Sequence, residues 1–252
     1  MAVDVVVVNY KTDDLLIEFI ESYEKHKFDG CTLTVVDIQP TALLADPLRY
    51  TYKAFADNVG YSKACNVGAS YGTNDVILLA NADTVLSEGL EECHDALMGF
   101  DGWGCLGPRQ VNENNQITAG GIFGHTQAPK QRSWLEQDHG QCNDVREDAL
   151  TISGALYFVK RSVWDELTKC PMFQQVNPGA IGAFLNTPHY YEETFCSYHM
   201  RAHGYSCVFY GAVQMIHYWH RASPTGGWAD QQMARSRDLH RNACAIHGIA
   251  CE

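Results

Sequence analysis

The chain has 252 residues, of which 46% are hydrophobic and 19% charged, so it can bury a sizeable core as a globular protein. Its net charge of −12 disfavours broad, non-specific binding to nucleic acid or anionic membranes, which requires clustered Lys and Arg. No apolar run approaches the length of a membrane span, and the N-terminus does not have the pattern of a signal peptide. We therefore expect a cytoplasmic protein without a membrane span, which is compatible with peripheral attachment to a membrane.

The ten cysteines are irregularly spaced, and none forms a CxxC pair. Several fall within expected strands or helices, among them Cys65, Cys105 and Cys207. This placement favours reduced thiols that act as small core residues. A disulfide framework is the alternative.

The N-terminal segment has the pattern of a β-α-β unit. Residues 3–9 form an apolar run typical of a buried strand, and apolar residues recur on one helical face over residues 12–27. A second strand covers residues 32–36 and is followed by Asp37, an acidic residue at the edge of the expected sheet. No GxGxxG follows the first strand, so a dinucleotide cofactor is not expected.

The next segment combines a short strand at residues 51–55 with a loop that leads into a helix. Gly60 precedes this helix, and a glycine there lets a ligand approach free backbone amides. Asn58 and Asn66 bracket the start of the helix. An ordinary loop-to-helix junction explains the same residues.

The stretch VILLANADT, residues 76–84, is the centre of the sequence pattern. Five apolar residues predict a strand buried on both faces, and Asn81 and Asp83 follow at its carboxyl end. Ligands of open α/β sheets bind at this edge, so Asp83 is placed to hold a metal ion or a sugar hydroxyl. An Asx turn or a helix cap is the alternative.

The remaining elements are read from apolar periodicity and from Gly and Pro positions. Helices are expected at residues 87–98, 161–168, 192–203 and 229–247, and strands at residues 103–106, 150–159 (broken at Gly154) and 205–210. Residues 110–148 are expected to form a polar loop or hairpin region that faces an acceptor, and residues 171–190 another loop.

Several of these segments together resemble the inverting family 2 glycosyltransferases of the GT-A fold, in order from residue 3 to about residue 220. The motifs that carry the resemblance are Asn9-Tyr10, Asp57 to Gly68, Leu78 to Thr84 as a form of the metal-binding DxD motif, Gly107-Pro108, Ser153-Gly154-Ala155, Glu192-Glu193 with the helix that runs to Gly204-Tyr205, and His217. Each motif alone is weak, but together, in the right order over most of a chain, they are a strong signal.

The resemblance implies a Rossmann-like three-layer α/β/α sandwich with a mainly parallel central sheet and a C-terminal helical appendage. We expect residues 1–222 to form the GT-A domain and residues 223–252 to form a loop and a helix packed on it. The chain departs from the family pattern at several positions: Asp37-Ile38-Gln39-Pro40, Asn81, Glu193, Phe195 and His199.

The resemblance also implies a divalent cation. Transfer from a nucleotide-diphospho-sugar, with UDP-sugars favoured, releases a diphosphate whose charge a cation neutralises as a Lewis acid. Asp83 would supply an oxygen ligand and His217 a nitrogen ligand, a set that suits Mn²⁺ or Mg²⁺. A buried, hydrogen-bonded structural histidine is the alternative for His217.

A general base must take the proton of the acceptor hydroxyl. Glu193 aligns with the catalytic aspartate of the family, and its neighbour Glu192 would orient the site or bind the acceptor. Two solvated acids at a helix N-terminus are the alternative. Because the residues are adjacent, we expect different roles for them.

The donor is expected to lie across the ends of the first two strands. Asp37 is the candidate for the uracil or ribose contact, and Tyr10 for stacking on the base. Trp219 and Trp228 flank a glycine-containing loop that could close over the donor, and backbone amides with His220 or Arg221 would meet the diphosphate. The full set of expected donor-binding residues is Asn9, Tyr10, Asp37, Asn58, Gly60, Asn66, Asn81, Asp83, Gly154 and Trp219.

Two rival functions remain open. One is a non-catalytic module of the same fold that binds a sugar nucleotide or glycan, and the other, less favoured, is a nucleotidyltransferase. The acceptor could be a glycan, a glycolipid, a protein side chain or a modified nucleic-acid base, of which nucleic acid is the least favoured because of the acidic charge. The sequence does not define the sugar or the oligomeric state.

Overall fold

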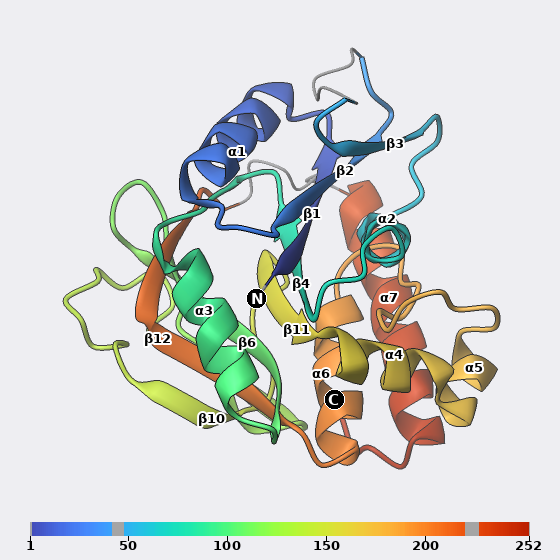
Figure 1. Ribbon diagram of the computed structural model, residues 1–252. Helices are drawn as coiled ribbons and strands as arrows, with labels where there is room; N and C mark the ends of the chain where they lie inside the picture. The colour runs from blue at the N-terminus through green and yellow to red at the C-terminus, as the bar shows by residue number, and fades with distance from the viewer. Residues whose placement is uncertain (1, 42–47, 220–226, 252) are drawn as a thin grey trace.

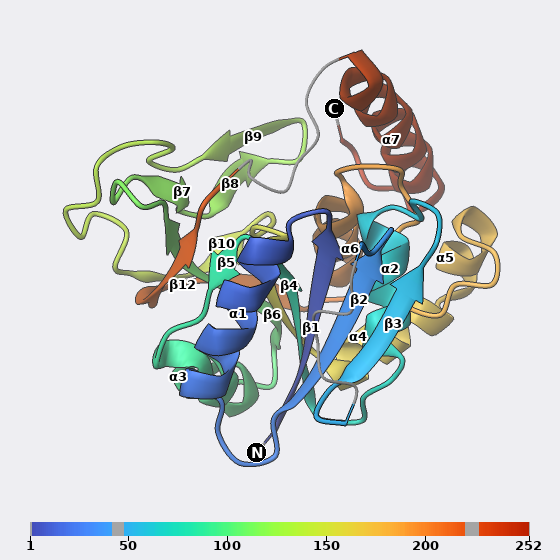
Figure 2. The ribbon, with the colours of Figure 1, turned by 90° about the horizontal axis from the view of Figure 1, so that it is seen from above.

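The computed structural model describes residues 2–41, 48–219 and 227–251, which form a twisted mixed sheet between two layers of helices (Figures 1 and 2). The sheet has the order β10-β12-β6-β11-β4-β1-β2-β3. Its strands are β1 (Val3–Tyr10), β2 (Thr32–Ile38), β3 (Thr51–Phe55), β4 (Val76–Asn81), β6 (Trp103–Val111), β10 (Val145–Ala149), β11 (Leu156–Lys160) and β12 (Ser206–His217). Strands β3, β2, β1 and β4 pair in parallel, as do β6 and β12, whereas β11 is antiparallel to both of its neighbours.

Two short strands add to this sheet, and two more form a separate one. β5 (Thr84–Val85) pairs with the end of β12, and β7 (Ile117–Ala119) pairs with β6. β8 (Ile122–His125) and β9 (Ala128–Gln131) form a separate hairpin. The polar region at residues 110–148 is therefore built from short strands, as the hairpin expectation allowed.

Alternate residues of β1 face the two helical layers. Val5 and Val7 pack with α1 (Asp13–His26) and α3 (Gly89–Gly99). Val6 and Val8 pack on the opposite face with α2 (Tyr61–Ala69), α4 (Arg161–Lys169) and α6 (Glu192–Ala202). A run of apolar residues on both faces of a strand is what a sheet covered on both sides requires.

The two remaining helices, α5 (Pro171–Val176) and α7 (Gly227–Ile246), lie outside these layers, with α7 against α5 and α6 (Figure 1). Phe173, Phe195 and Cys244 form a separate small core between them. α7 thus packs on the body of the fold, as expected for a C-terminal appendage. The expected boundary at residue 222 lies outside the described residues.

The sequence prediction was wrong about a few elements. Residues 171–190 were expected to be a loop, but Pro171 occupies the first turn of α5, where a missing N–H costs nothing. β6 and β12 continue past Gly107-Pro108 and Gly211, which the sequence pattern suggested as stops. β11 begins at Leu156, after Gly154 rather than on both sides of it.

An ion pair with surrounding hydrogen bonds connects the elements at the amino ends of the strands. The buried Asp4 carboxylate accepts hydrogen bonds from Thr32, from Asn74 and from the Arg161 guanidinium, which is 2.7 Å away. Arg161 also donates to the carbonyls of Ala69 and Asn74. This network ties β1, β2, α2 and α4 together at the edge of the sheet opposite the carboxyl ends.

None of the helices in the described part of the chain is long and apolar enough to cross a bilayer. All ten cysteines are free thiols, and seven of them are fully buried in the cores, for example Cys65, Cys105 and Cys207.

Candidate active site

A cavity of about 340 Å³ opens at the carboxyl ends of β1, β2, β4 and β12. Figure 2 shows the ends of β1 and β2 directed toward the side of the molecule that carries the β8–β9 hairpin and α7. The residues proposed from the sequence that line this cavity are Tyr10, Asn58, Gly60, Asn81, Gly154, Glu192, Glu193, His217 and Trp219. They come from segments spread over the whole chain, and the fold brings them to the edge where α/β sheets bind ligands.

Glu192 and Glu193 begin α6 and face the cavity. Glu192 is 5% exposed, and one of its carboxylate oxygens accepts a hydrogen bond from the Thr187 hydroxyl at 3.0 Å. Burial, together with the neighbouring Glu193 charge, raises the pKa of Glu192 to about 8. Burial also raises the pKa of Glu193, opposed by hydrogen bonds from the start of the helix. The site therefore contains one carboxyl that is protonated near neutral pH next to a second that is made more basic.

The backbone that leads into α6 is strained. Tyr190 and Tyr191 both have left-handed conformations, with φ angles of 63° and 71°. A non-glycine residue in this region costs about 1–3 kcal/mol, and such residues are concentrated at functional sites. Here the strained turn places Tyr190 and the two glutamates on the wall of the cavity.

Gly154 provides the space that Glu193 occupies. A Cβ atom at Gly154 would lie 3.2 Å from Cγ and 3.3 Å from the carboxyl carbon of Glu193. The Gly154 carbonyl accepts a hydrogen bond from the Tyr61 hydroxyl at 2.8 Å, which fixes this loop to the start of α2. The Ser153-Gly154-Ala155 segment is therefore shaped around the Glu193 side chain.

Asp83 and His217 are held together by the β5–β12 pairing. His217 pairs with Thr84, and the Asp83 carbonyl accepts a hydrogen bond from the amide of Tyr218. His217 Nε2 lies 3.6 Å from Asp83 Oδ1. Two ligands of one ion are separated by about 3.0–3.5 Å at metal–ligand distances near 2.1 Å, so this oxygen–nitrogen pair fits a divalent cation. His217 lines the cavity, whereas Asp83 is 1% exposed and lies behind the lining, next to Asn81.

Besides Asp83, three of the expected donor-binding residues lie outside the cavity lining: Asn9, Asp37 and Asn66. The Asp37 carboxylate accepts hydrogen bonds from Asn9 and from the Tyr52 hydroxyl, and burial raises the pKa of Asp37. The Asn9 amide oxygen accepts from the backbone and the hydroxyl of Thr12 at the start of α1. Asn66 bonds to both backbone groups of Phe184 and ties α2 to the loop before α6. In the structure these hydrogen bonds connect β1 with β2 and α1, β2 with β3, and α2 with the loop before α6.

Sequence reasoning missed several residues of the cavity wall. Trp134 comes from the segment between β9 and β10, and its ring meets that of Trp219 edge to face at a centroid distance of 4.9 Å. His189 and Tyr190 contribute a second aromatic pair, with ring centroids 3.8 Å apart. The loops that carry them showed no periodicity, so only their aromatic content could have drawn attention. Trp228, His220 and Arg221, also considered for donor binding, lie outside the part of the chain whose side chains are described.

No protein-family model and no curated relative matches the sequence. Solved structures do match at probability 1.00. The mannosyltransferase PcManGT from Pyrobaculum calidifontis in complex with GDP-Man and Mn²⁺ has a TM-score of 0.62 and 15% identity, over 96% of this chain and 64% of that one. GalNAc-T7 with UDP, GalNAc and Mn²⁺ has a TM-score of 0.66 and 13% identity, over 100% and 55%. S. aureus TarS 1–349 in complex with UDP-GlcNAc has a TM-score of 0.63 and 11% identity, over 98% and 66%.

These similarities show that the chain has the GT-A glycosyltransferase fold, which confirms the fold expected from the sequence. The chain spans 64% and 55% of the length of the first two of these proteins.

Proposed function

We propose that this chain is a metal-dependent, inverting glycosyltransferase that moves a sugar from a nucleotide-diphospho-sugar to an acceptor hydroxyl. The observation that carries the proposal is the convergence, at one cavity on a GT-A fold, of the Glu192–Glu193 pair and the Asp83–His217 pair. A UDP-linked donor is favoured because two of the similar structures were solved with UDP or UDP-GlcNAc, although the mannosyltransferase was solved with GDP-Man.

Glu193 is the general base in this proposal. A base works best when its pKa lies near the working pH, and burial shifts the pKa of Glu193 in that direction. Attack by the deprotonated acceptor oxygen on the anomeric carbon, on the face opposite the diphosphate, gives inversion. The proton of the acceptor hydroxyl passes to the Glu193 carboxylate.

Glu192 is a positioning group. With a pKa of about 8 it is mostly protonated near pH 7, so one of its oxygens can donate a hydrogen bond while the other accepts the bond from the Thr187 hydroxyl. Keeping Glu192 neutral also avoids two adjacent negative charges beside the acceptor hydroxyl.

Asp83 and His217 would hold Mn²⁺ or Mg²⁺, which supplies Lewis-acid stabilisation of the leaving diphosphate when bound. The aromatic residues Tyr10, Trp134 and Trp219 give the cavity flat apolar faces on which a nucleobase or sugar ring can stack. Trp219 itself has a left-handed backbone conformation, with φ of 52°.

Thermal unfolding with a panel of UDP- and GDP-sugars, with and without Mn²⁺, tests the donor site. A ligand that binds only the folded state raises the melting temperature by mass action. We expect a metal-dependent rise with one nucleotide sugar, together with release of the nucleoside diphosphate on turnover. Asp83→Asn should abolish the metal-dependent part, whereas the exposed-site control Asp29→Asn should keep it.

Two other outcomes are informative. Tight, metal-dependent nucleotide binding without transfer or hydrolysis of any donor would favour the non-catalytic binding module. The core position of Phe195, stacked 6.0 Å from Phe173 where the family has an acidic residue, is the feature compatible with that function. No rise with any nucleotide would contradict the proposed donor site.

A further inference from the structure

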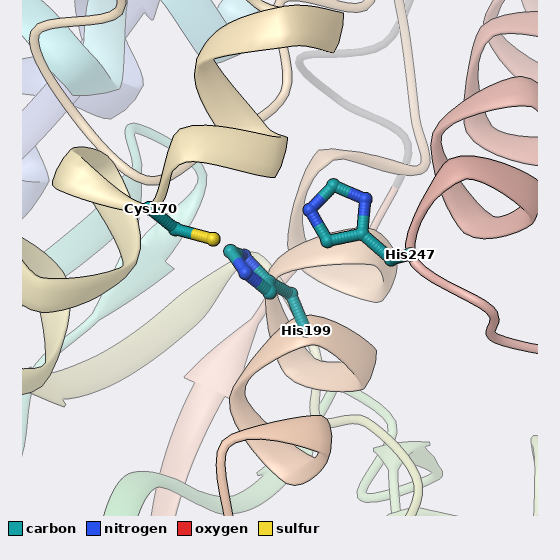
Figure 3. A group of neighbouring side chains, drawn as sticks. All are labelled: Cys170, His199 and His247. Atoms are coloured by element: carbon teal, nitrogen blue, oxygen red, sulfur yellow. The ribbon is translucent and has the colours of Figure 1, made fainter.

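A second group of metal-ligating side chains lies away from the cavity, where α4, α5, α6 and α7 meet. It consists of Cys170, between α4 and α5, His199 in α6, and His247, just after α7. Figure 3 shows the Cys170 sulfur directed at the His199 ring, with the His247 ring close by. Their sulfur and nitrogen ligand atoms all lie within 4.8 Å of one another.

His199 is the central member of this group. It is 1% exposed, and neither of its ring nitrogens has a hydrogen-bond partner among the described residues. A buried imidazole must satisfy its polar atoms, because an unpaired buried donor or acceptor carries a desolvation cost. A ligand between the three side chains would remove this cost.

His247 is oriented as a metal ligand would be. Its Nδ1 lies 2.8 Å from the Ala243 carbonyl oxygen and donates to it, so Nε2 carries the lone pair. Nε2 is buried and has no hydrogen-bond partner in the described part of the chain. A backbone carbonyl that fixes the tautomer of a histidine in this way is typical of metal-bound imidazoles.

Aromatic side chains surround this group, and both histidines are neutral. Phe173 and Phe195 flank the His199 ring at centroid distances of 5.6 Å each, and Phe195 meets the His247 ring at 5.2 Å. Burial lowers the pKa of His199 to about 3 and also lowers that of His247, so both rings are unprotonated near neutral pH, as metal binding requires.

We propose that Cys170, His199 and His247 bind a zinc ion that fastens the C-terminal helix to the helical layer of the fold. Thiolate and imidazole ligands favour Zn²⁺ over the Mn²⁺ or Mg²⁺ of the donor site. In a tetrahedral zinc site these atoms are separated by about 3.3–3.6 Å, and here they already lie within 4.8 Å of one another, so small side-chain movements would complete the site. The Cys170 thiol releases its proton to solvent on binding, and a water molecule takes the fourth position.

This site would have a structural role. It joins three segments that are far apart in the sequence, one of which is the helix that begins with Glu192 and Glu193. α7 also supports the wall of the cavity, because the Ser236 hydroxyl accepts a hydrogen bond from the His189 amide. Zinc at Cys170, His199 and His247 would therefore stabilise the fold without taking part in sugar transfer.

Metal content and cobalt spectra of the full chain test the proposal. After treatment with a chelator and then Zn²⁺, we expect one tightly held zinc per chain and a raised melting temperature. Co²⁺ in its place should give a thiolate-to-cobalt charge-transfer band. The Asp83→Asn variant should keep both signals, since the donor site contains no thiolate, and so should Cys31→Ser, which changes a half-buried cysteine before β2.

Cys170→Ser and His247→Gln should each lose the charge-transfer band and the zinc-dependent rise in melting temperature. In the absence of metal they should melt close to the metal-free parent chain, which separates loss of the ion from loss of the fold. The second nearby group, His240, Cys244 and Cys251, provides the sharpest contrast. Absence of stoichiometric zinc, or binding that Cys244→Ser removes while Cys170→Ser retains it, would overturn the proposal.

Discussion

Glu192 and Glu193 are neighbours in sequence, but their surroundings separate their chemistry. Glu192 is buried against Thr187, whereas Glu193 lies over Gly154 with helix-terminal amides as hydrogen-bond donors. From the sequence, Glu193 is the candidate base because it aligns with the catalytic aspartate of the family that the chain resembles, and Glu192 is expected to orient the site or bind the acceptor. The difference in burial and hydrogen bonding supports the proposal that Glu193 is the base and that Glu192 stays protonated.

Replacement of each glutamate by glutamine tests this division. Glu193→Gln should reduce the transfer rate by about 10²–10⁴-fold, the usual contribution of a general base, and should leave nucleotide binding intact. Glu192→Gln should retain much more activity, because an amide can replace a protonated carboxyl as a hydrogen-bond donor. Steady-state rates and donor affinities of the two variants measure the difference. Equal losses in both would contradict the assignment.

The raised pKa of Glu192 also makes stability depend on pH. Its ordinary value is 4.5 and its folded value about 8, so the native protein holds this proton more tightly than the unfolded chain does. The stability that Glu192 contributes is full below about pH 4.5 and is lost as the pH rises through about 8. Urea unfolding between pH 5 and 8 should show the parent chain losing up to a few kcal/mol relative to Glu192→Gln. A constant difference across this range would mean that the carboxyl titrates normally.

At the scale of elements, the amino ends and the carboxyl ends of the strands have different roles. The amino ends are closed by the Asp4–Arg161 network, and the carboxyl ends carry the cavity. A glycine leaves room for the key carboxylate at each end. A Cβ at Gly72 would lie 2.1 Å from the Asp4 carboxylate, and a Cβ at Gly154 would lie 3.2 Å from Cγ of Glu193. Stability and ligand binding can therefore be changed separately.

Asp4→Asn tests that separation. It removes the charge opposite Arg161 and one of the acceptors used by Thr32 and Asn74, and should lower the free energy of unfolding by about 3 kcal/mol. Because Asp4 lies at the amino end of β1, donor affinity at a temperature where the variant is folded should stay unchanged. Denaturant unfolding and nucleotide titration measure the two effects, with the exposed Asp29→Asn as the matched control. A change in donor affinity would show that the two edges are coupled.

The sequence predicted the central elements well because their signals are local. The apolar runs of β1, β2 and β4 and the residues after them identified the sheet and its carboxyl edge. It predicted less where long-range pairing decides the structure: β12 runs past Gly211 because β6 lies beside it. The hydrogen bonds of Asp37 with Asn9 and Tyr52 likewise depend on the parallel pairing of β1, β2 and β3, which local sequence patterns do not specify.

At the scale of the whole molecule, α7 is the element whose place in the domain matters most for folding. The sequence predicts that residues 223–252 form a loop and a helix packed on the domain, and Ala243 and Cys244 of α7 are buried in one core with Phe173 and Phe195. A helix that shares a core with its neighbours should unfold together with them. We therefore expect the described elements to form a single cooperative unit.

A chain that ends at residue 226 tests this expectation. Without α7 the apolar faces of α5 and α6 are exposed, and the His189 amide loses its bond to Ser236. The shortened chain should melt well below the full chain and bind nucleotide more weakly, since the His189–Tyr190 turn forms part of the cavity wall. Ser236→Ala in the full chain should reproduce a small part of the effect, about 1 kcal/mol of stability. If the shortened chain melted like the full one, α7 would be an independent attachment and its contacts with α5 and α6 would contribute little to the fold.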